Sequence, residues 1–286
     1  MRVCDGRGGY ATHRKRTLFC ELCPFTYRLS VWKGQAIRAV SDLFHPSPFC
    51  TVKQEEKLPA LICRHKSLIR RTLGEVDPRL QENKAVNLGI AAPKVSGVLI
   101  RPGECFSFWR LVGSCTAKKG YLEGLTINRG KTGTDIGGGM CQFTNLIHWL
   151  VLHRPLRITE HHHHDSIDLF PDFGRQVPFG VGTSVFYNYL DYRFVNMTSR
   201  TYQLITYTDD TYLCGEMRAD RPPDKKYHIK TEGEFFSREP DGVYRNGRVL
   251  RECVDIKTGM VIGKELIKEN HAKVLYDTEG LETVRI

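Results

Sequence analysis

The run Gly137-Gly138-Gly139-Met140-Cys141-Gln142 places three consecutive glycines just before a cysteine. Downstream of this run, apolar residues recur at the spacing of one helix face until Pro155: they are Phe143, Leu146, Ile147, Leu150 and Val151. The pattern predicts a glycine turn followed by a helix. Cys141 is therefore expected at or near the N-terminus of that helix.

The position predicted for Cys141 suits a nucleophile. Unpaired backbone N–H groups and the helix dipole favour an anion at a helix N-terminus, so we expect the pKa of the thiol to lie below its usual value of about 8.5. Glycines let backbone N–H groups turn toward a substrate. The candidates for oxyanion and substrate binding are therefore Gly137, Gly138, Gly139 and Gln142. The alternative is a tight turn that carries an ordinary buried cysteine.

The run Glu160-His161-His162-His163-His164-Asp165 begins soon after the expected end of the helix. A thiol nucleophile needs a base, and histidine, with an unperturbed pKa of about 6.5, suits that role near neutral pH. Alternate residues of an extended segment face the same way, so His162 and His164 are expected to point together, away from their neighbours. Glu160, Asp165 or Asp168 would orient the imidazole as the third member of a triad. The predicted catalytic residues are Cys141, His162, His164 and Asp165.

Two other interpretations of the histidine run stay open. It is either a solvated polar loop or, with alternate histidines and an acidic residue or Cys141 as ligands, a three-ligand zinc site. A second metal motif is incomplete: Cys20 and Cys23 form one CxxC, and only Cys50 and Cys63, at unusual spacing, would supply the other pair. We therefore predict no bound metal and no other cofactor.

Composition describes a globular, basic protein. The 286 residues, of which 41% are hydrophobic, are enough for one large or two modest domains. A net charge of +10 favours anionic partners such as nucleic acid, teichoic-type polymers or pyrophosphate-linked lipid precursors. The basic residues gather at 13–16 and 64–71, without the interleaved aromatic residues of a nucleic-acid module, so nucleic acid is not expected as a partner.

The ten cysteines bear on the compartment. They are scattered, and a chain of this length does not need disulfides for stability, so we expect reduced thiols. The N-terminal residues lack the apolar core of an export signal, and no run approaches the roughly 18 apolar residues of a membrane-spanning helix. The sequence therefore predicts a cytoplasmic protein without a transmembrane segment.

Apolar periodicity and turn residues outline an α+β fold. Amphipathic helices are expected over residues 29–44, 58–73 and 83–92, the last ending before Pro93. Short strands are expected at 98–100, 105–108 and 125–127, and a hairpin at 202–206 and 212–214 around Asp209 and Asp210. Further strands at 234–236, 242–252 and 274–276 make a β-rich tail.

Several separated motifs together resemble the VanW family. They are Gln81-Glu82-Asn83-Lys84, Asn87-Leu88, the PGExFSFW-like run from Pro102 to Trp109, the GGGxCQ run that contains Cys141, and the ExHxH run from Glu160 to His164. The family is named after an accessory protein of vancomycin-resistance gene clusters, and some of its domains act as cysteine L,D-transpeptidases that cross-link peptidoglycan. The resemblance implies Cys141 as the nucleophile and His162 or His164 as the base. Cys105 and His161 depart from the family pattern.

With this resemblance the chain divides into three expected parts: a basic, mainly helical N-terminal region at 1–79, a mixed VanW-like core at 80–200 and a β-rich tail at 201–286. The implied function lies in peptidoglycan metabolism or glycopeptide resistance, as a cysteine acyltransferase of the L,D-transpeptidase type. Its expected partner is a peptidoglycan peptide or precursor, or an anionic cell-wall polymer. The alternatives are a non-catalytic accessory protein that binds a cell-wall precursor, and a metal-binding protein. Cross-linking takes place outside the membrane, whereas the sequence itself favours the cytoplasm.

Overall fold

The computed structural model describes residues 18–71, 77–128, 131–163, 167–168, 171, 177–187 and 189–285. The chain forms two compact units, Met1–Phe44 and His45–Ile286. Helices and strands are both abundant, so the predicted α+β class is confirmed.

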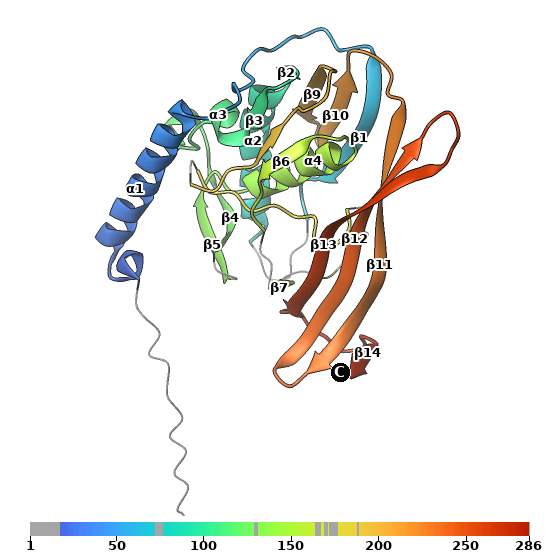
Figure 1. Cartoon of the computed structure of the whole chain (residues 1–286). Helices are drawn as coiled ribbons and strands as arrows, with labels where there is room; N and C mark the ends of the chain where they lie inside the picture. The colour runs from blue at the N-terminus through green and yellow to red at the C-terminus, as the bar shows by residue number, and fades with distance from the viewer. Residues whose placement is uncertain are drawn as a thin grey trace, which may run out of the picture. The chain divides into compact units, whose positions relative to one another are not determined.

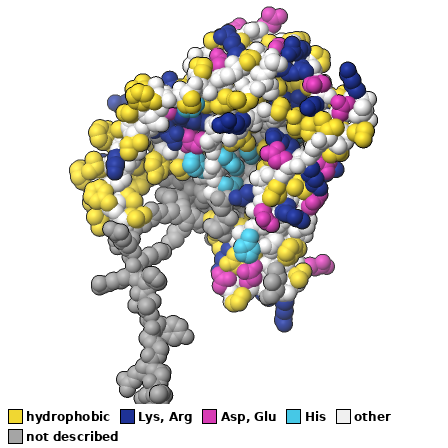
Figure 2. Space-filling view, in the orientation of Figure 1, with side chains coloured by type: hydrophobic (Ala, Val, Ile, Leu, Met, Phe, Trp, Pro, Cys, Tyr) yellow, Lys and Arg dark blue, Asp and Glu magenta, His cyan; other side chains and the backbone are white. Residues whose placement is uncertain are grey.

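The described part of the first unit is a helix with exposed apolar side chains. A short 3-10 turn, η1 (Phe19–Glu21), precedes α1 (Pro24–Leu43). Pro24 suits the first helical position, and the Thr26 hydroxyl accepts the backbone N–H of Cys23 at 3.0 Å. The predicted 29–44 helix is thus confirmed, with an earlier start that these residues explain. Figure 2 shows apolar side chains along α1, which buries none of its residues.

The second unit contains a four-stranded antiparallel sheet in the order β1 (Ala60–Leu68), β10 (Tyr212–Ala219), β9 (Tyr202–Thr208) and β2 (Val98–Ile100) (Figure 1). Strands β9 and β10 form the predicted hairpin. Asp209 closes the turn of this hairpin by accepting the backbone N–H groups of Thr211 and Tyr212. The helix predicted over 58–73 is wrong, because residues 60–68 form β1.

A bulge explains why β1 has a helix-like pattern. It lies between Leu61 and Cys63 and shifts the pairing with β10, so that apolar residues before and after it no longer alternate with a period of two. The segment becomes a strand because it pairs with β10, from Ala60 opposite Ala219 to Leu68 opposite Tyr212. The region before residue 80 therefore contributes a strand as well as a helix.

Two long helices pack on the four-stranded sheet and bury the core of the second unit. Helix α2 (Pro78–Val95) contacts β9, and α4 (Met140–Leu152) contacts β1 and β10. Gly215 in β10 allows α4 to approach, since a Cβ there would lie 2.9 Å from Leu150 Cδ1 and 3.0 Å from Leu146 Cδ2. Helix α4 confirms the helix predicted after the glycine run.

Helix α2 is longer than the predicted 83–92. Asp77 caps it, because its carboxylate accepts the backbone N–H of Arg79 at 2.8 Å, and Pro78 takes the first helical position. At the other end the helix continues through Pro93 and ends at Val95. A proline so close to the end removes one hydrogen bond of the last turn, so it does not stop the helix at once.

Smaller sheets surround this core. One has the order β3 (Cys105–Ser107), β8 (Arg193–Val195), β6 (Arg157–Glu160), and another pairs β4 (Glu123–Asn128) with β5 (Lys131–Ile136). The strands predicted at 98–100 and 125–127 are confirmed, whereas Phe108, predicted as strand, begins α3 (Phe108–Val112). A 3-10 turn, η2 (Ala117–Lys119), follows α3.

The tail is a long antiparallel meander of β11 (Lys225–Glu239), β12 (Gly242–Asp255) and β13 (Val261–Val274). The short strands β14 (Thr283–Arg285) and β7 (Ile167–Asp168) lie at its two edges (Figure 1). The strands predicted at 234–236 and 242–252 fall within β11 and β12, whereas β13 ends at the first residue of the third predicted strand. The β-rich character of the tail is therefore confirmed.

Candidate functional site

Cys141 lies in the first turn of α4, as the sequence predicts. Gly139 precedes the helix with a φ of 110°, in the left-handed region that favours glycine. Close packing also requires the glycines: a Cβ at Gly138 would lie 2.4 Å from the backbone carbon of Gly124, and one at Gly139 would lie 2.6 Å from Cγ of Lys84. The run is thus fixed by both turn geometry and packing.

The fold itself uses part of the backbone of this glycine turn. The Gly137 N–H donates to the carbonyl of Leu122 at 2.9 Å, and the Gly138 carbonyl accepts a hydrogen bond from Asn87 Nδ2 at 2.9 Å. Among the described residues, none accepts a hydrogen bond from the N–H of Gly138 or Gly139. Of the amides predicted for an oxyanion hole, that of Gly137 is therefore already engaged.

Burial decides the protonation state of Cys141. Part of the residue is accessible, but its removal from water raises the pKa of the thiol, and hydrogen bonds from the Val185 N–H and from its own N–H only partly oppose this. The predicted lowering of the pKa is wrong, because the cost of burying a thiolate exceeds the benefit of the helix N-terminus. Cys141 is therefore a neutral thiol at neutral pH.

Residues 182–185 pack against the first turns of α4. The Cys141 carbonyl accepts hydrogen bonds from Thr144 Oγ1 at 3.2 Å and from Thr183 Oγ1 at 3.4 Å, and the two threonine hydroxyls are hydrogen-bonded to each other. The Thr183 N–H donates to Asn145 Oδ1 at 2.6 Å. The sequence interpretation missed these residues. Thr144 and Asn145 lie three and four positions after Cys141, a spacing that places them on its helix face.

His161 and His163 lie on the side of their segment that packs toward α4. His161 Nε2 is 2.9 Å from the Gly182 carbonyl oxygen, and a Cβ at Gly182 would lie 3.0 Å from His163 Nε2. The His161 ring also stacks on His148 of α4, with 4.5 Å between the ring centroids. Gly182 directly precedes Thr183, so both histidines reach the segment that contacts the first turns of α4. Figure 2 shows histidine side chains gathered near the centre of the face it displays.

His148 forms the buried side of this histidine stack. Its Nδ1 is 2.9 Å from the hydroxyl of Tyr192. Burial, and then the nearby charges of protonated His161 and His163, lower the pKa of His148 well below its usual value. His148 is therefore neutral at neutral pH and gives the exposed His161 ring an uncharged stacking partner.

His162 lies on the opposite side of the segment. Its Nε2 is 3.0 Å from Glu160 Oε1, which also accepts the backbone N–H of Asp191 at 2.9 Å. Arg193 Nε completes this group at 2.7 Å from Asp191 Oδ2 and 3.6 Å from Glu160 Oε2. The predicted alternation therefore directs His162 toward a carboxylate. Among the described residues, no hydrogen bond links His162 to the Cys141 sulfur.

The other predicted members of the triad are not part of this cluster. His164 and Asp165 lie outside the described residues. Asp168 is buried in β7, where its carboxylate accepts hydrogen bonds from Arg245 Nη1 at 3.5 Å and from the Tyr276 hydroxyl at 3.2 Å. Asp168 thus serves the tail sheet, and Glu160 is the carboxylate that contacts a predicted histidine.

Gln142 and Lys84 flank the glycine turn. Gln142 Nε2 donates to Ser67 Oγ at 2.9 Å and to the Leu68 carbonyl at 2.8 Å, which ties α4 to the end of β1. Lys84 is buried in α2, its Nζ donates to Gln81 Oε1 at 2.6 Å, and burial lowers its pKa to about 8. The Gln142 side-chain amide is therefore engaged in hydrogen bonds within the fold. Its predicted role in substrate binding stays a prediction.

The CxxC cysteines and their suggested partners fall in different units. Cys20 and Cys23 belong to the first unit and Cys50 and Cys63 to the second. Burial raises the pKa of Cys50 strongly and that of Cys63 to about 12, so both are protonated. Across the described ranges, no group of three or more His, Cys, Asp or Glu side chains is placed to hold a metal ion. In the same ranges no helix is long and apolar enough to span a membrane.

The fold and the site define an α+β protein with a cysteine at the N-terminus of a core helix, next to a histidine-rich segment. A family model described as VanW like protein matches residues 83–218, which include both features. The chain is 36% identical over 222 residues to "Vancomycin B-type resistance protein VanW" of Enterococcus faecalis, a match that covers 78% of this chain and 80% of that protein. The chain therefore belongs to the VanW family, as its motifs indicate.

A second relative shares a smaller part of the chain. It is "Uncharacterized protein YoaR" of Bacillus subtilis, 28% identical over 118 residues, which are 40% of this chain and 36% of that protein. No solved structure matches the chain significantly.

Proposed function

We propose that this VanW-family protein takes part in the peptidoglycan chemistry of glycopeptide resistance, as a cysteine acyltransferase of the L,D-transpeptidase type. The observation that carries the proposal is the position of Cys141. It lies in the first turn of α4, directly after the glycine turn and against residues 182–185, which also contact His161 and His163. The name of the Enterococcus faecalis relative supports the link with resistance.

In the proposed reaction the Cys141 sulfur attacks a peptide carbonyl of a stem peptide. A C–S bond forms, the C–N bond to the departing residue breaks, and the leaving amine takes up the proton that the thiol has given up. An amine of a second stem peptide then attacks the thioester: a new C–N amide bond forms, the C–S bond breaks, and the proton of the amine restores the Cys141 thiol. The amides of Gly138 and Gly139 are the proposed donors to the oxyanion in both steps.

A base must receive the thiol proton, because the raised pKa keeps Cys141 neutral at rest. The family motif points to His162 or His164 for this role. His162 is bound to Glu160 on the far side of the segment, whereas the His163 ring lies against Gly182, next to the residues that contact α4. We therefore assign proton transfer to His163 and positioning of the segment to His162.

The compartment decides which substrate this chemistry meets. A cytoplasmic location, as the sequence predicts, would offer the protein cell-wall precursors. A location outside the membrane would offer it the polymer. A test of the proposal therefore has to include both kinds of substrate.

The decisive measurement is intact mass spectrometry after incubation with a stem tetrapeptide, with a disaccharide-linked precursor and with isolated peptidoglycan. We expect an acyl adduct on the wild type, none on Cys141→Ala and markedly less on His163→Ala than on His162→Ala. Cys253→Ala is the matched control, because this partly exposed cysteine belongs to the tail strand β12. An adduct that survives Cys141→Ala, or its absence with all three substrates, contradicts the proposal.

One observation favours a second candidate function. The Cys141 thiol is neutral, and no base in the described part of the chain is hydrogen-bonded to its sulfur. These properties also fit an accessory protein that binds a cell-wall precursor without reacting with it. Binding of the tetrapeptide that persists in both Cys141→Ala and His162→Ala, without any turnover by the wild type, would identify this function instead.

A further inference from the structure

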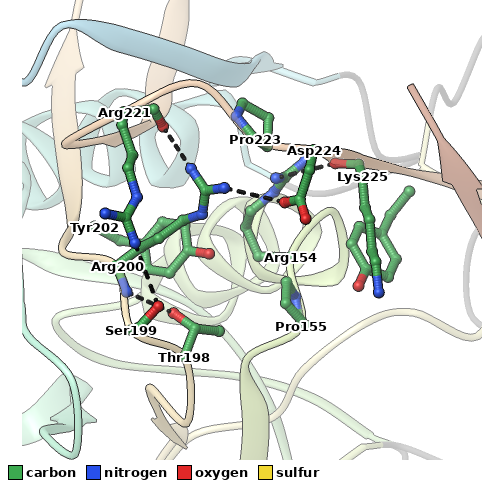
Figure 3. Close-up of a pocket in the computed structure, with 11 residues that line it drawn as sticks. Arg154, Pro155, Thr198, Ser199, Arg200, Tyr202, Arg221, Pro223, Asp224 and Lys225 are labelled. Carbon is green, nitrogen blue, oxygen red and sulfur yellow. Dashed lines mark hydrogen bonds and ion pairs between the residues drawn. The ribbon is translucent and has the colours of Figure 1, made fainter. Parts of the chain in front are cut away.

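A pocket of about 450 Å³ lies beyond the C-terminal end of α4 (Figure 3). The turn between α4 and β6, the turn between β8 and β9, and the connection between β10 and β11 meet there. Its charged side chains are Arg154, Arg200, Arg221, Lys225 and Asp224. Four cations and one carboxylate therefore line a space that the proposed acyl transfer does not use.

The single carboxylate of this pocket is already paired. Asp224 Oδ1 accepts a hydrogen bond from Arg200 Nη2 at 3.0 Å, and Arg200 also donates to the carbonyl of Arg221 at 3.1 Å, as Figure 3 shows. Arg200 thus ties the connection at 221–224 to the turn before β9. Within the described part of the chain, Arg154, Arg221 and Lys225 form no direct ion pair with a carboxylate of the pocket, although the charge of Lys225 helps to lower the pKa of Asp224.

Arg154 is the most informative of these three cations. It is only 4% exposed, and its Nε has no hydrogen-bond partner within the described part of the chain. Its Nη1 reaches the Lys225 carbonyl only at 3.5 Å, and its guanidinium lies 5.6 Å from the centre of the Tyr227 ring. A buried charge with an unsatisfied donor and no carboxylate beside it in the described residues is costly, so such a group indicates an acceptor that a ligand supplies.

The two exposed cations suit the mouth of the site. Among the described residues, the Arg221 guanidinium donates to a neutral group, the Ser199 hydroxyl, at 3.3 Å, and Lys225 is exposed at the start of β11. Both lie on or next to the connection between β10 and β11. An anion bound by them and by Arg154 would therefore bridge the end of α4 and the start of the tail.

We propose that this pocket binds a phosphate or pyrophosphate group, with Arg154 at its base and Arg221 and Lys225 at its mouth. Guanidinium groups match the oxygens of a phosphate in a bidentate geometry. A single carboxylate would neutralise one of the three cations, whereas a pyrophosphate carries enough charge for all of them. The site is distinct from the candidate active site, because a helix of 13 residues separates the two by about 20 Å.

The test is a calorimetric titration of the full chain with inorganic phosphate and with inorganic pyrophosphate, at constant ionic strength. We expect pyrophosphate to bind more tightly than phosphate. Arg221→Gln should weaken pyrophosphate binding by about tenfold, because it removes one charge-assisted hydrogen bond. Arg238→Gln is the matched control, since it removes the same charge from an exposed arginine of β11 and should leave the affinity within twofold, about the noise of such a measurement.

A second variant tests the buried cation directly. Arg154→Met removes the guanidinium and keeps a long side chain, so the unliganded protein should fold at least as stably as the wild type. The rise in melting temperature that pyrophosphate gives the wild type should be lost in this variant. Cys141→Ala should keep the full rise, which separates this site from the acyltransferase proposal.

The origin of the phosphate group is a further arm of the same experiment. Farnesyl pyrophosphate in detergent represents a lipid-linked ligand, and inorganic pyrophosphate represents a free one. Tighter binding of the former identifies a lipid source and equal binding a soluble one, and both support the site. Equal weakening by Arg221→Gln and Arg238→Gln, or no binding of any of these probes at millimolar concentration, would overturn the proposal.

Discussion

The two ends of α4 show what burial does to a group that can give up its charge and to one that cannot. At the N-terminus, burial raises the pKa of Cys141 and keeps its thiol protonated. Just beyond the C-terminus, Arg154 is 4% exposed and keeps its charge, although its Nε has no partner in the described part of the chain. The helix dipole favours the charged form at both ends, but it decides neither outcome, because the thiol can neutralise and the guanidinium cannot.

This difference separates the needs of the two ends. The N-terminal end needs a proton acceptor before it can react, whereas the C-terminal end needs an anion before its charge is balanced. Four changes test this comparison.

The largest effect is expected at the glycine turn of the N-terminal end. Gly138→Ala should lower the free energy of unfolding by about 3 kcal/mol, because the added Cβ would lie 2.4 Å from the backbone of Gly124. Urea unfolding measures this. Gly89→Ala in α2 is the control: its Cβ would meet only Thr208 Oγ1 at 3.8 Å, and helix propensity should make it neutral or slightly stabilising. Equal behaviour of the two variants would mean that the turn is not packed as described.

The reactivity of Cys141 should show a strong dependence on pH. Because burial raises its pKa, alkylation by iodoacetamide should accelerate about tenfold per pH unit, or about a hundredfold between pH 7 and 9. Cys23 is the internal reference, since hydrogen bonds from the Thr26 backbone N–H and hydroxyl lower its pKa and its rate should level off at lower pH. Peptide mass spectrometry follows both sites. If the alkylation rate of Cys141 levels off at a lower pH than that of Cys23, the helix N-terminus lowers the pKa of Cys141 more than burial raises it.

Lys84 beside the glycine turn should link stability to pH. Burial, and to a smaller extent the positive charges of Arg71 and Arg70, lower the pKa of Lys84 to about 8, whereas an unfolded lysine titrates near 10.4. Between these values the unfolded chain holds the extra proton, so the free energy of unfolding rises with pH. The burial penalty is therefore fully present at pH 7 and largely relieved by pH 10.

Substitution of Lys84 isolates this contribution from that of other groups. Lys84→Met should have a stability advantage over the wild type that shrinks by about 2 kcal/mol between pH 7 and pH 10. Urea unfolding at the two pH values measures the change. Lys226→Met, at an exposed lysine of β11, controls for the loss of a positive charge. An advantage that stays constant with pH would show that Lys84 is not desolvated in solution.

Local patterns predict part of this molecule well. The glycine run, the face of α4 and the hairpin around Asp209 depend on residues close in sequence, and all three are as predicted. The strand β1 is not, because its bulge disturbs the alternation and its partner β10 lies far along the chain. Local sequence patterns reflect interactions between residues close in sequence, whereas the strand conformation of β1 depends on its pairing with the distant strand β10.

The candidate site divides in the same way. The position of Cys141 and the alternation of the histidines follow from backbone geometry, but the pKa of the thiol depends on how much protein surrounds it. The partner of His162 was within reach of the sequence, since Glu160 lies two residues away. The cations around Arg154 were not, because they come from turns at 154, 200 and 221–225 that only the tertiary fold brings together.

The smallest expected change in the free energy of unfolding is at the C-terminal end of α4. Whether the variant gains or loses stability there is what tests the comparison. Arg154→Met should raise the free energy of unfolding by about 1 kcal/mol without ligand, because it removes a buried charge that no carboxylate of the described residues balances. Arg193→Met is the matched control, since Arg193 is also 4% exposed but lies 2.7 Å from Asp191. Its loss leaves a buried carboxylate without its cation and should cost about 3 kcal/mol. If both variants lose stability alike, Arg154 has an acceptor in the protein itself, and the contrast between the two ends of α4 disappears.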